Sequence, residues 1–349
     1  MKNSITFCVF SDLHYKYGTY TASVEDLLAI LKRAGDGRVD FVIHCGDLCN
    51  DFTGSPELYN AYLNNSFDLR VYGIYGNHDL EASGNSMEFV TPKLTNDPNA
   101  VWGTENGQIG NGQIGYYYFD FNGFRIICAD TNYSYCEQSM TWEHNRTGSH
   151  TSPKGNIGTH SLGDKQLVWL ENTLWDAKKN DLRCIVFSHA AFSGYWESSP
   201  DCEKVRKLFK EVNEKGKNTV IAAINGHTHK PNTVIIEGVL YFDAGSAING
   251  EWIENGYEHY PEEMTYIRSE YDAEGKLVER KEVPLSEARM SRNSWYFEKP
   301  LSAIFTVETN GHIVINGMKT KWVYGIFPDN KKLKPEIVDD EFYLSGDGE

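Results

Sequence analysis

The stretch AAINGHTHKPN, residues 222–232, decides how the rest of the chain is interpreted. A short apolar run ends at Ile224, and His227 and His229 follow with one residue between them. Runs of this length and composition are typical of strands that are buried on both faces. Residues two apart on an extended segment point to the same side, which by itself suggests one metal ion with two ligands. A catalytic pair and two ordinary surface histidines are the alternatives at this point.

The same arrangement of an apolar run followed at once by polar residues occurs elsewhere in the first two thirds of the chain. These runs are Ile5–Phe10 before SDLH, Phe41–Ile43 before HCGDLCND, Val71–Tyr75 before GNHD, Phe124–Cys128 before ADTN, and Cys184–Phe187 before SHAAF. Each run predicts a buried strand that ends in a group of polar side chains.

Helical patterns lie between some of these runs, at residues 23–35, 163–180 and 201–216. The first begins at Ser23, a favourable N-cap residue, and ends near Gly35. Alternation of strand, helix and strand predicts an α/β fold. In such folds the functional groups collect beyond the carboxyl ends of the strands, which is where the polar residues lie here.

Two regions depart from this alternation. Residues 133–162 are polar with little periodicity, so they are interpreted either as a functional insertion or as a solvated loop. After about residue 255, apolar and polar residues alternate around the turn signals AEGK and NG, which predicts β-hairpins. The short repeat at 107–115 is interpreted as a loop.

Bulk properties exclude several classes of protein. The 349 residues carry a net charge of −16 and no visible basic stripe, which argues against long nucleic acids and anionic membrane surfaces as partners. No apolar run is long enough to span a membrane, and the N-terminal run is too short for a signal peptide. The seven cysteines fit buried free thiols in a reducing cytoplasm, with half a zinc knuckle at Cys45 and Cys49 as the weaker alternative.

The polar residues at the strand ends form a set with the chemistry of a metal site. They are Asp12, His14, Asp47, Asn77, His78, Asp79, His189, His227 and His229. Imidazoles mixed with carboxylate and amide oxygens suit Mn, Fe or Zn, whereas all-oxygen Ca or Mg sites would not need so many histidines. Each residue alone is weak evidence, but the pattern recurs in five segments and supplies enough ligands for two ions.

The motifs DLH, GD, GNHD, a lone H and GHTH occur in this order between Asp12 and His229. With them the chain resembles the calcineurin-like metallophosphoesterases. The resemblance implies a four-layer αββα sandwich of two mixed sheets flanked by helices, which we take as a catalytic domain over residues 1–255. The alternation after about residue 255 predicts an additional β-rich C-terminal region, a β-hairpin extension over 256–349 that packs on that domain or continues it.

The resemblance also implies a binuclear centre of two divalent or trivalent ions. Carried over by position, it places Asp12, His14 and His229 at the first metal, Asn77, His189 and His227 at the second, and Asp47 at both. A shared carboxylate offsets the repulsion between two closely spaced cations. The implied reaction is hydrolysis of a small phosphate mono- or diester, a nucleotide among the candidates, by a hydroxide that bridges the metals.

The resemblance implies that His78 contacts the phosphate and protonates the leaving oxygen, with a purely structural histidine as the alternative. Asp79 is assigned to the catalytic set as a residue that orients its neighbours. Relatives with phosphatase activity often carry Asp three residues after the bridging Asp, where this chain has Asn50. Purple acid phosphatases carry Tyr at that place, which argues against that branch.

Two other functions are consistent with the same fold. One is a non-catalytic scaffold, which would be expected to have lost some of the ligands, and none is missing here. The other is a nuclease of the same superfamily, which the acidic charge disfavours for long substrates.

Overall fold

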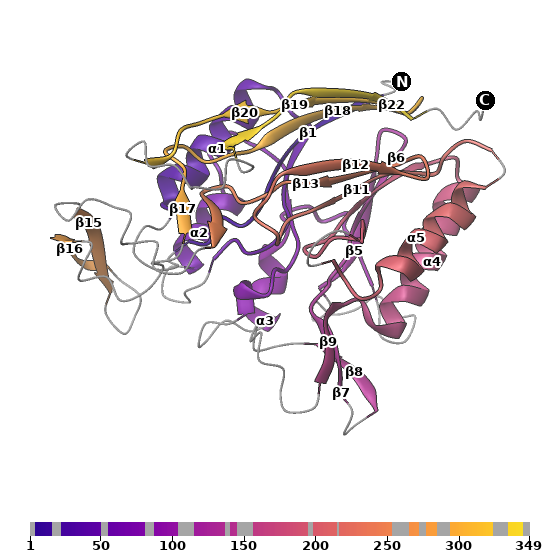
Figure 1. Cartoon of the computed structure of the whole chain (residues 1–349), viewed down its shortest axis with the longest axis horizontal. Helices are drawn as coiled ribbons and strands as arrows, with labels where there is room; N and C mark the ends of the chain where they lie inside the picture. Colours follow the sequence, from indigo (N-terminus) through magenta and orange to yellow (C-terminus); the bar gives the residue numbers. More distant parts are fainter. Residues whose placement is uncertain are drawn as a thin grey trace.

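The computed structural model describes residues 4–15, 22–49, 55–80, 87–103, 115–136, 140–144, 156–194, 198–214, 216–252, 265–271, 277–284, 294–323 and 334–344. Within these residues two large mixed β-sheets lie face to face, with helices on their outer sides (Figure 1). The predicted αββα sandwich is therefore confirmed.

The first sheet, in the described part of the chain, has six strands in the order β22-β19-β18-β1-β2-β3. Their bounds are β22 (Asp340–Tyr343), β19 (His312–Asn316), β18 (Ala303–Glu308), β1 (Ser4–Phe10), β2 (Phe41–His44) and β3 (Val71–Gly73). Strands β1, β2 and β3 are mutually parallel, and β18 pairs antiparallel with β1. The C-terminal hairpin β18–β19 thus extends the sheet that the N-terminal strand begins.

The second sheet has seven described strands in the order β12-β13-β11-β10-β6-β5-β4. Their bounds are β12 (Asn232–Ile236), β13 (Val239–Asp243), β11 (Val220–Asn225), β10 (Arg183–Phe187), β6 (Phe124–Cys128), β5 (Tyr117–Phe121) and β4 (Val101–Trp102). The four central strands are parallel, and every residue of β6, β10 and β11 is buried. This agrees with the continuous apolar runs of the sequence.

Helices on both outer faces complete the four layers. The helices are α1 (Val24–Asp36), α2 (Ser55–Leu63), α3 (Met87–Val90), α4 (Gly163–Lys179) and α5 (Cys202–Asn213), with short 3-10 turns at η1 (His78–Leu80) and η2 (Thr91–Lys93). Helix α1 begins as predicted, because Ser23 and Asp26 form a reciprocal capping box. Helices α4 and α5 lie against the second sheet (Figure 1).

Smaller sheets lie outside the sandwich. They are β8 (Thr141–His144), β7 (Tyr133–Cys136) and β9 (Asn156–Ser161) in one sheet, and the pairs β14 (Asn249–Trp252) with β17 (Ser294–Tyr296), β15 (Thr265–Tyr271) with β16 (Leu277–Pro284), and β20 (Met318–Lys319) with β21 (Glu336–Ile337). The polar segment 133–162 therefore contains strands. The β15–β16 pair is the predicted hairpin around AEGK. Of the predicted loop at 107–115, only Gly115 lies within the described residues.

Aromatic side chains fill the space between the two large sheets. Phe7 of β1 stacks on Phe41 and on Phe305, with ring centroids 5.2 Å and 5.1 Å away. Its edge meets Phe187 of the second sheet at 5.7 Å. Burial of such rings stabilises the sandwich and fixes the two sheets relative to each other.

The structure describes the side chains of six cysteines, all of them free thiols, and five of the six are buried. Burial raises the pKa of Cys8 to about 11, so this thiol stays protonated. Among the described residues, no helix combines the length and the apolar character that a membrane span requires.

Candidate metal centre

Three parallel strands of the first sheet deliver polar residues to one edge of the sandwich. Asp12 and His14 follow β1, Asp47 follows β2, and Asn77 follows β3. Because the strands are parallel and adjacent, their carboxyl ends meet. The loops are also joined directly, since the amides of Asp12 and His14 donate to the carbonyls of Gly46 and Asp47 at 3.0 Å and 2.9 Å.

Two parallel strands of the second sheet deliver the remaining histidines to the same edge. His189 follows β10, and His227 and His229 follow β11. The amide of Gly226 donates to the carbonyl of His189 at 3.1 Å, which joins these two loops.

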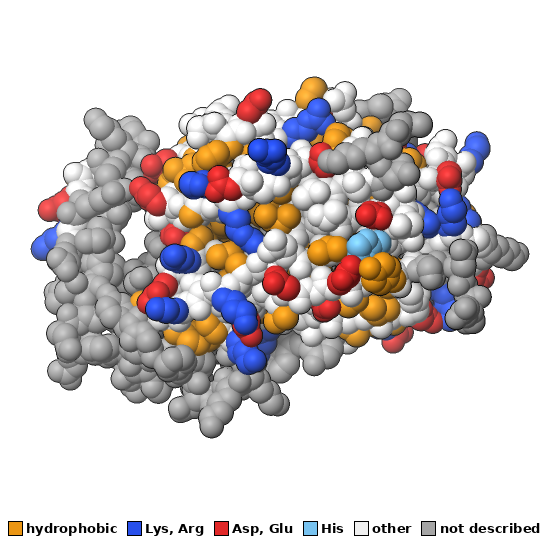
Figure 2. All heavy atoms as spheres, turned by 90° about the horizontal axis from the view of Figure 1, so that it is seen from above, with side chains coloured by type: hydrophobic (Ala, Val, Ile, Leu, Met, Phe, Trp, Pro, Cys, Tyr) orange, Lys and Arg blue, Asp and Glu red, His pale blue; other side chains and the backbone are white. Residues whose placement is uncertain are grey.

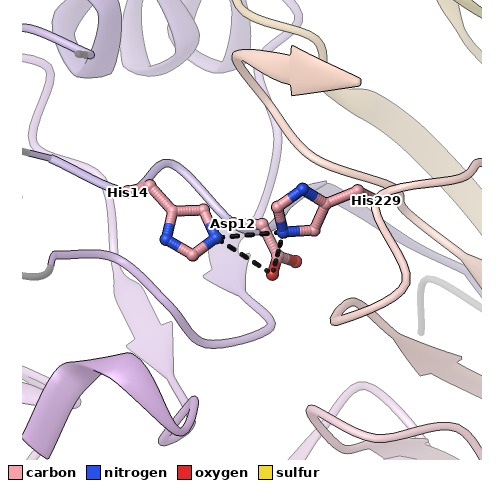
Figure 3. A group of neighbouring side chains, drawn as sticks. All are labelled: Asp12, His14 and His229. Carbon is pink, nitrogen blue, oxygen red and sulfur yellow. Dashed lines mark hydrogen bonds and ion pairs between the residues drawn. The ribbon is translucent and has the colours of Figure 1, made fainter. Parts of the chain in front are cut away.

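Asp12, His14 and His229 form one cluster (Figure 3). Nε2 of His14 and Nε2 of His229 lie 3.0 Å apart. Oδ1 of Asp12 lies 3.6 Å from the first nitrogen and 3.3 Å from the second. All three side chains are buried and point to one place.

Asp47, His189 and His227 form a second cluster. Nε2 of His189 lies 3.3 Å from Oδ2 of Asp47 and 3.2 Å from Nδ1 of His227. The amide oxygen Oδ1 of Asn77 lies 3.1 Å from the same His189 nitrogen. The structure thus brings together the four side chains that the resemblance assigns to the second metal.

Asp47 lies between the two clusters. Its Oδ2 is 3.3 Å from His189 and 3.7 Å from Nε2 of His14, which belongs to the first cluster. Its Oδ1 accepts a hydrogen bond from the amide of His78 at 2.8 Å. There is no room for a Cβ at Gly76, because that place is occupied by the Asp47 carboxylate.

The atoms of the first cluster are better suited to binding a cation than to hydrogen bonding with one another. Oδ1 of Asp12 is buried and accepts no hydrogen bond. It faces two imidazole nitrogens that also face each other. A buried acceptor without a donor is costly, and a divalent ion among these three atoms would satisfy all of them.

The electrostatics favour the protonation states that metal ligands need. Burial opposes ionisation of Asp12 and Asp47, but the surrounding histidines outweigh it and hold the pKa of both carboxyls low. Burial lowers the pKa of His227 and His229, so both imidazoles are neutral. Burial acts the same way on His189, but the Asp47 carboxylate prevails and raises its pKa to about 10. An ion at His189 would have to displace a proton.

Hydrogen bonds behind the clusters fix how the side chains are aimed. Nδ1 of His189 donates to the carbonyl of Cys45 at 2.7 Å, which leaves Nε2 directed at Asp47. Oδ2 of Asp12 accepts from the amide of His227 at 2.9 Å and from the hydroxyl of Ser11. Supports of this kind are a regular feature of metal sites.

The backbone is in an unusual conformation at most of the predicted ligands. Left-handed φ angles occur at Asp12 (51°), His14 (50°), Asp47 (50°), His227 (72°) and His229 (58°). Such angles are uncommon for residues with a side chain and concentrate at functional sites.

The profile of the calcineurin-like phosphoesterase family matches residues 5–231. The chain belongs to this family. Calcineurin-like phosphoesterases are a dimetal-dependent family that acts on phosphate esters. No curated protein sequence matches this chain.

Several solved structures are similar to this chain. A dimetal phosphatase from Danio rerio is 14% identical with a TM-score of 0.57, and the match covers 98% of this chain and 99% of that chain. GAP50, the anchor in the inner membrane complex of Plasmodium, is 16% identical with a TM-score of 0.48, covering 98% and 89%. The calcineurin-like phosphoesterase YfkN from Bacillus subtilis is 14% identical with a TM-score of 0.41, covering 80% and 90%. The likeness to the Danio rerio structure shows a shared fold.

His78 lies at the rim of the first cluster. Its ring centroid is 5.0 Å from that of His14, and its side chain could reach an ion together with His14 and Asp47. It is 8% exposed, more than the carboxylates beside it. His78 therefore lies beside the first cluster and is more open to solvent than Asp12 or Asp47.

Asp79 is placed differently, because its carboxylate faces backbone rather than the clusters. It accepts hydrogen bonds of 2.8–3.2 Å from the amides of Gly76, Asp47, Leu48 and Cys49. It thereby joins the loop after β2 to the loop after β3. Asn50, the position at which this chain departs from its relatives, lies outside the described residues.

His160 is a residue near the site that sequence reasoning did not single out. It lies at the end of β9, with its ring centroid 4.4 Å from that of His227 and a left-handed φ of 66°. In the sequence it is one of several histidines in the polar segment 133–162, with no spacing that relates it to GHTH. Among the described residues, the groups of side chains able to hold a metal include no cysteine.

Proposed function

We propose that this chain is a binuclear metal-dependent hydrolase of small phosphate mono- or diesters. The observation that carries the proposal is the position of Asp47 between two buried clusters of metal-binding side chains. A structural polar network would not need two groups of ligands that share one carboxylate.

In this proposal one ion is held by Asp12, His14 and His229, and the other by Asn77, His189 and His227, with Asp47 bound to both. Bound ions would neutralise phosphate charge and lower the pKa of a coordinated water. The mixed nitrogen and oxygen ligands suit Mn, Fe or Zn. Two carboxylates against two divalent cations leave a net positive centre, which attracts a phosphate.

The protein's own groups complete the reaction. We assign His78 to bind a phosphoryl oxygen and to give a proton to the leaving ester oxygen. Its backbone amide donates to Oδ1 of Asp47 at 2.8 Å, which keeps the residue beside the carboxylate that lies between the clusters. Asp79 acts through the backbone, since its four amide contacts hold Asp47 and the loop after β3 in place.

Small esters are the substrate class that the charge supports best. The chain carries a net charge of −16, which disfavours long nucleic acids. Among the described residues on the face in Figure 2, acidic and basic side chains are interspersed rather than gathered into a basic stripe. Nucleotides remain within this class.

The experiment is a screen of metal-reconstituted protein against a panel of phosphate mono- and diesters, with Asp47→Asn as a control. Metal-dependent turnover that the Asp47→Asn variant lacks is the expected result. A wild-type protein that binds two ions but hydrolyses no ester would instead favour a non-catalytic scaffold.

A further inference from the structure

The two histidines of the GHTH motif diverge, although residues two apart on a strand point the same way. Nδ1 of His227 lies 3.2 Å from His189 in the second cluster. Nε2 of His229 lies 3.0 Å from His14 in the first. The motif therefore cannot continue the extended conformation of β11, and both histidines have left-handed φ angles.

This conformation needs to be held in place. A left-handed backbone costs a residue with a side chain about 1–2 kcal/mol, and here two such residues are separated only by Thr228. The amide of Thr228 donates to the carbonyl of Gly226 at 2.9 Å, which makes the turn tight. The hydroxyl of Thr228 donates to Oδ2 of Asp243 at 2.6 Å. The middle residue of the motif is thus tied to a buried carboxylate.

Asp243 is itself fixed to the sheet. It is the last residue of β13 and pairs in register with Asn225, the last residue of β11. Its Oδ2 also accepts from Nδ2 of Asn225 at 2.8 Å, and its Oδ1 accepts from the amide of Gly245 at 2.9 Å. Asp243 is 7% exposed, and none of its three hydrogen-bond donors is a predicted metal ligand. It therefore connects the rigid end of the sheet to the tip of the motif.

Packing alone does not hold the motif on this side. A cavity of about 210 Å³ lies against it, lined by Thr228 and Asp243 together with Ser193, Lys230 and Tyr241, among others. On this side the hydrogen bond to Asp243 at 2.6 Å is the shortest contact of the Thr228 hydroxyl, which also lies 3.3 Å from the amide and 3.4 Å from the carbonyl of Lys230. The cavity also leaves space for a substituted side chain at either position.

We propose that Asp243 is a positioning residue that acts through Thr228 to keep His227 and His229 directed at different clusters. This inference rests on the proposed binuclear function, because it concerns how the two ions share one motif. A support behind metal-binding histidines commonly changes metal affinity by about 10–100-fold when it is removed.

The test compares two substitutions at Thr228, of which the first keeps the size of the side chain and the second removes only a methyl group. Thr228→Val removes the hydroxyl, and Thr228→Ser keeps it. Binding of Mn²⁺ is measured by calorimetry, and the electron paramagnetic resonance signal of a coupled manganese pair reports whether both ions are close together. We expect Thr228→Val to weaken binding of at least one ion by about 10–100-fold and to lose the coupled signal, with Thr228→Ser close to wild type.

Asp243→Ala should repeat the effect of Thr228→Val, and the two changes combined should add little to either alone. Tyr241→Phe, which alters the lining of the same cavity but leaves Thr228 and Asp243 unchanged, should bind Mn²⁺ as the wild type does. If Asp243→Ala fails to fold, the pair of Thr228 variants decides the question.

The failure of this inference is distinct from failure of the proposed function. Wild-type protein that binds no pair of Mn²⁺ ions would overturn both. Wild-type protein that binds the pair, together with Thr228→Val protein that binds it equally well, would overturn the positioning role alone.

Discussion

Nε2 of His14 and Nε2 of His229 lie 3.0 Å apart, although the two residues are 215 positions apart in the chain. They come from different sheets, so the whole sandwich must form before this cluster exists. An ion bound here would join the two sheets as well as the two residues. Because such a site is absent in the unfolded chain, metal binding and folding are coupled.

Asp47→Ala should lose both ions, because Asp47 contacts side chains of both clusters. Elemental analysis of the purified variant should find neither metal, whereas Asp164→Ala, an exposed control, should keep two per chain. Two metals per chain in Asp47→Ala protein would show that this carboxylate is not shared.

His78→Ala should keep both metals and slow turnover of an ester with a poor leaving group by roughly 10²–10⁴-fold, the usual effect of losing a general acid. An ester with a good leaving group, such as a nitrophenyl ester, should be affected much less. Steady-state kinetics on the two esters measure the difference. Equal losses on both would assign His78 to phosphate binding instead.

Asp79→Asn should destabilise the fold by about 2 kcal/mol or more, because an amide cannot accept all four backbone hydrogen bonds that the carboxylate accepts. Urea denaturation of the metal-free protein gives the free energy of unfolding. Asp181→Asn, at an exposed position, should change it by less than about 0.5 kcal/mol. An effect of similar size in the two variants would mean that Asp79 does not hold the loops together.

His44 should make the protein less stable in acid. Burial is the main reason that the pKa of His44 falls from 6.5 to about 3. The positive charge of His189 also lowers this pKa, whereas the negative charges of Asp47 and Asp12 oppose the shift. Tyr62 and Phe10 pack against its ring, and no group in the described structure bonds its Nε2. Above about pH 6.5 His44 is neutral in both the folded and the unfolded state, so it contributes nothing to the pH dependence of the free energy of unfolding.

Below that pH only the unfolded chain takes up the proton, so stability should fall by up to about 1.4 kcal/mol per pH unit until about pH 3. Urea denaturation of metal-free wild type and of His44→Asn, which keeps an acceptor for the Gly46 amide, measures the contribution. The variant should show a smaller loss between pH 6.5 and 4.5. Parallel curves for the two proteins would exclude His44 as the source.

Several elements could be predicted from the sequence because their causes are local. The capping box at Ser23 starts α1, and the apolar run before GHTH forms β11 with every residue buried. Turn signals predicted the hairpin of β18 and β19. In each case the residues that cause the structure are close together in the chain.

The partners of these elements could not be predicted in the same way. Alternation along β18 shows which side chains are buried, but it does not reveal that Phe305 lies opposite Phe7 of β1. The polar segment 133–162 was ambiguous, since its three strands are not apolar enough to be recognised without their neighbours. Strand pairing depends on residues far away in sequence, which a local pattern cannot specify.

The GHTH motif separates what can be predicted from the sequence from what depends on the tertiary structure. The sequence by itself determined the family and the side chains with metal-binding chemistry, because both depend on residue type and order. The resemblance also assigns His227 and His229 to different metals, but only the tertiary structure shows how one short motif reaches both clusters, with His227 beside His189 and His229 beside His14. The arrangement depends on the left-handed backbone at both histidines. We attribute the support of this backbone to Asp243, which accepts a hydrogen bond from Thr228 between neighbouring strand ends.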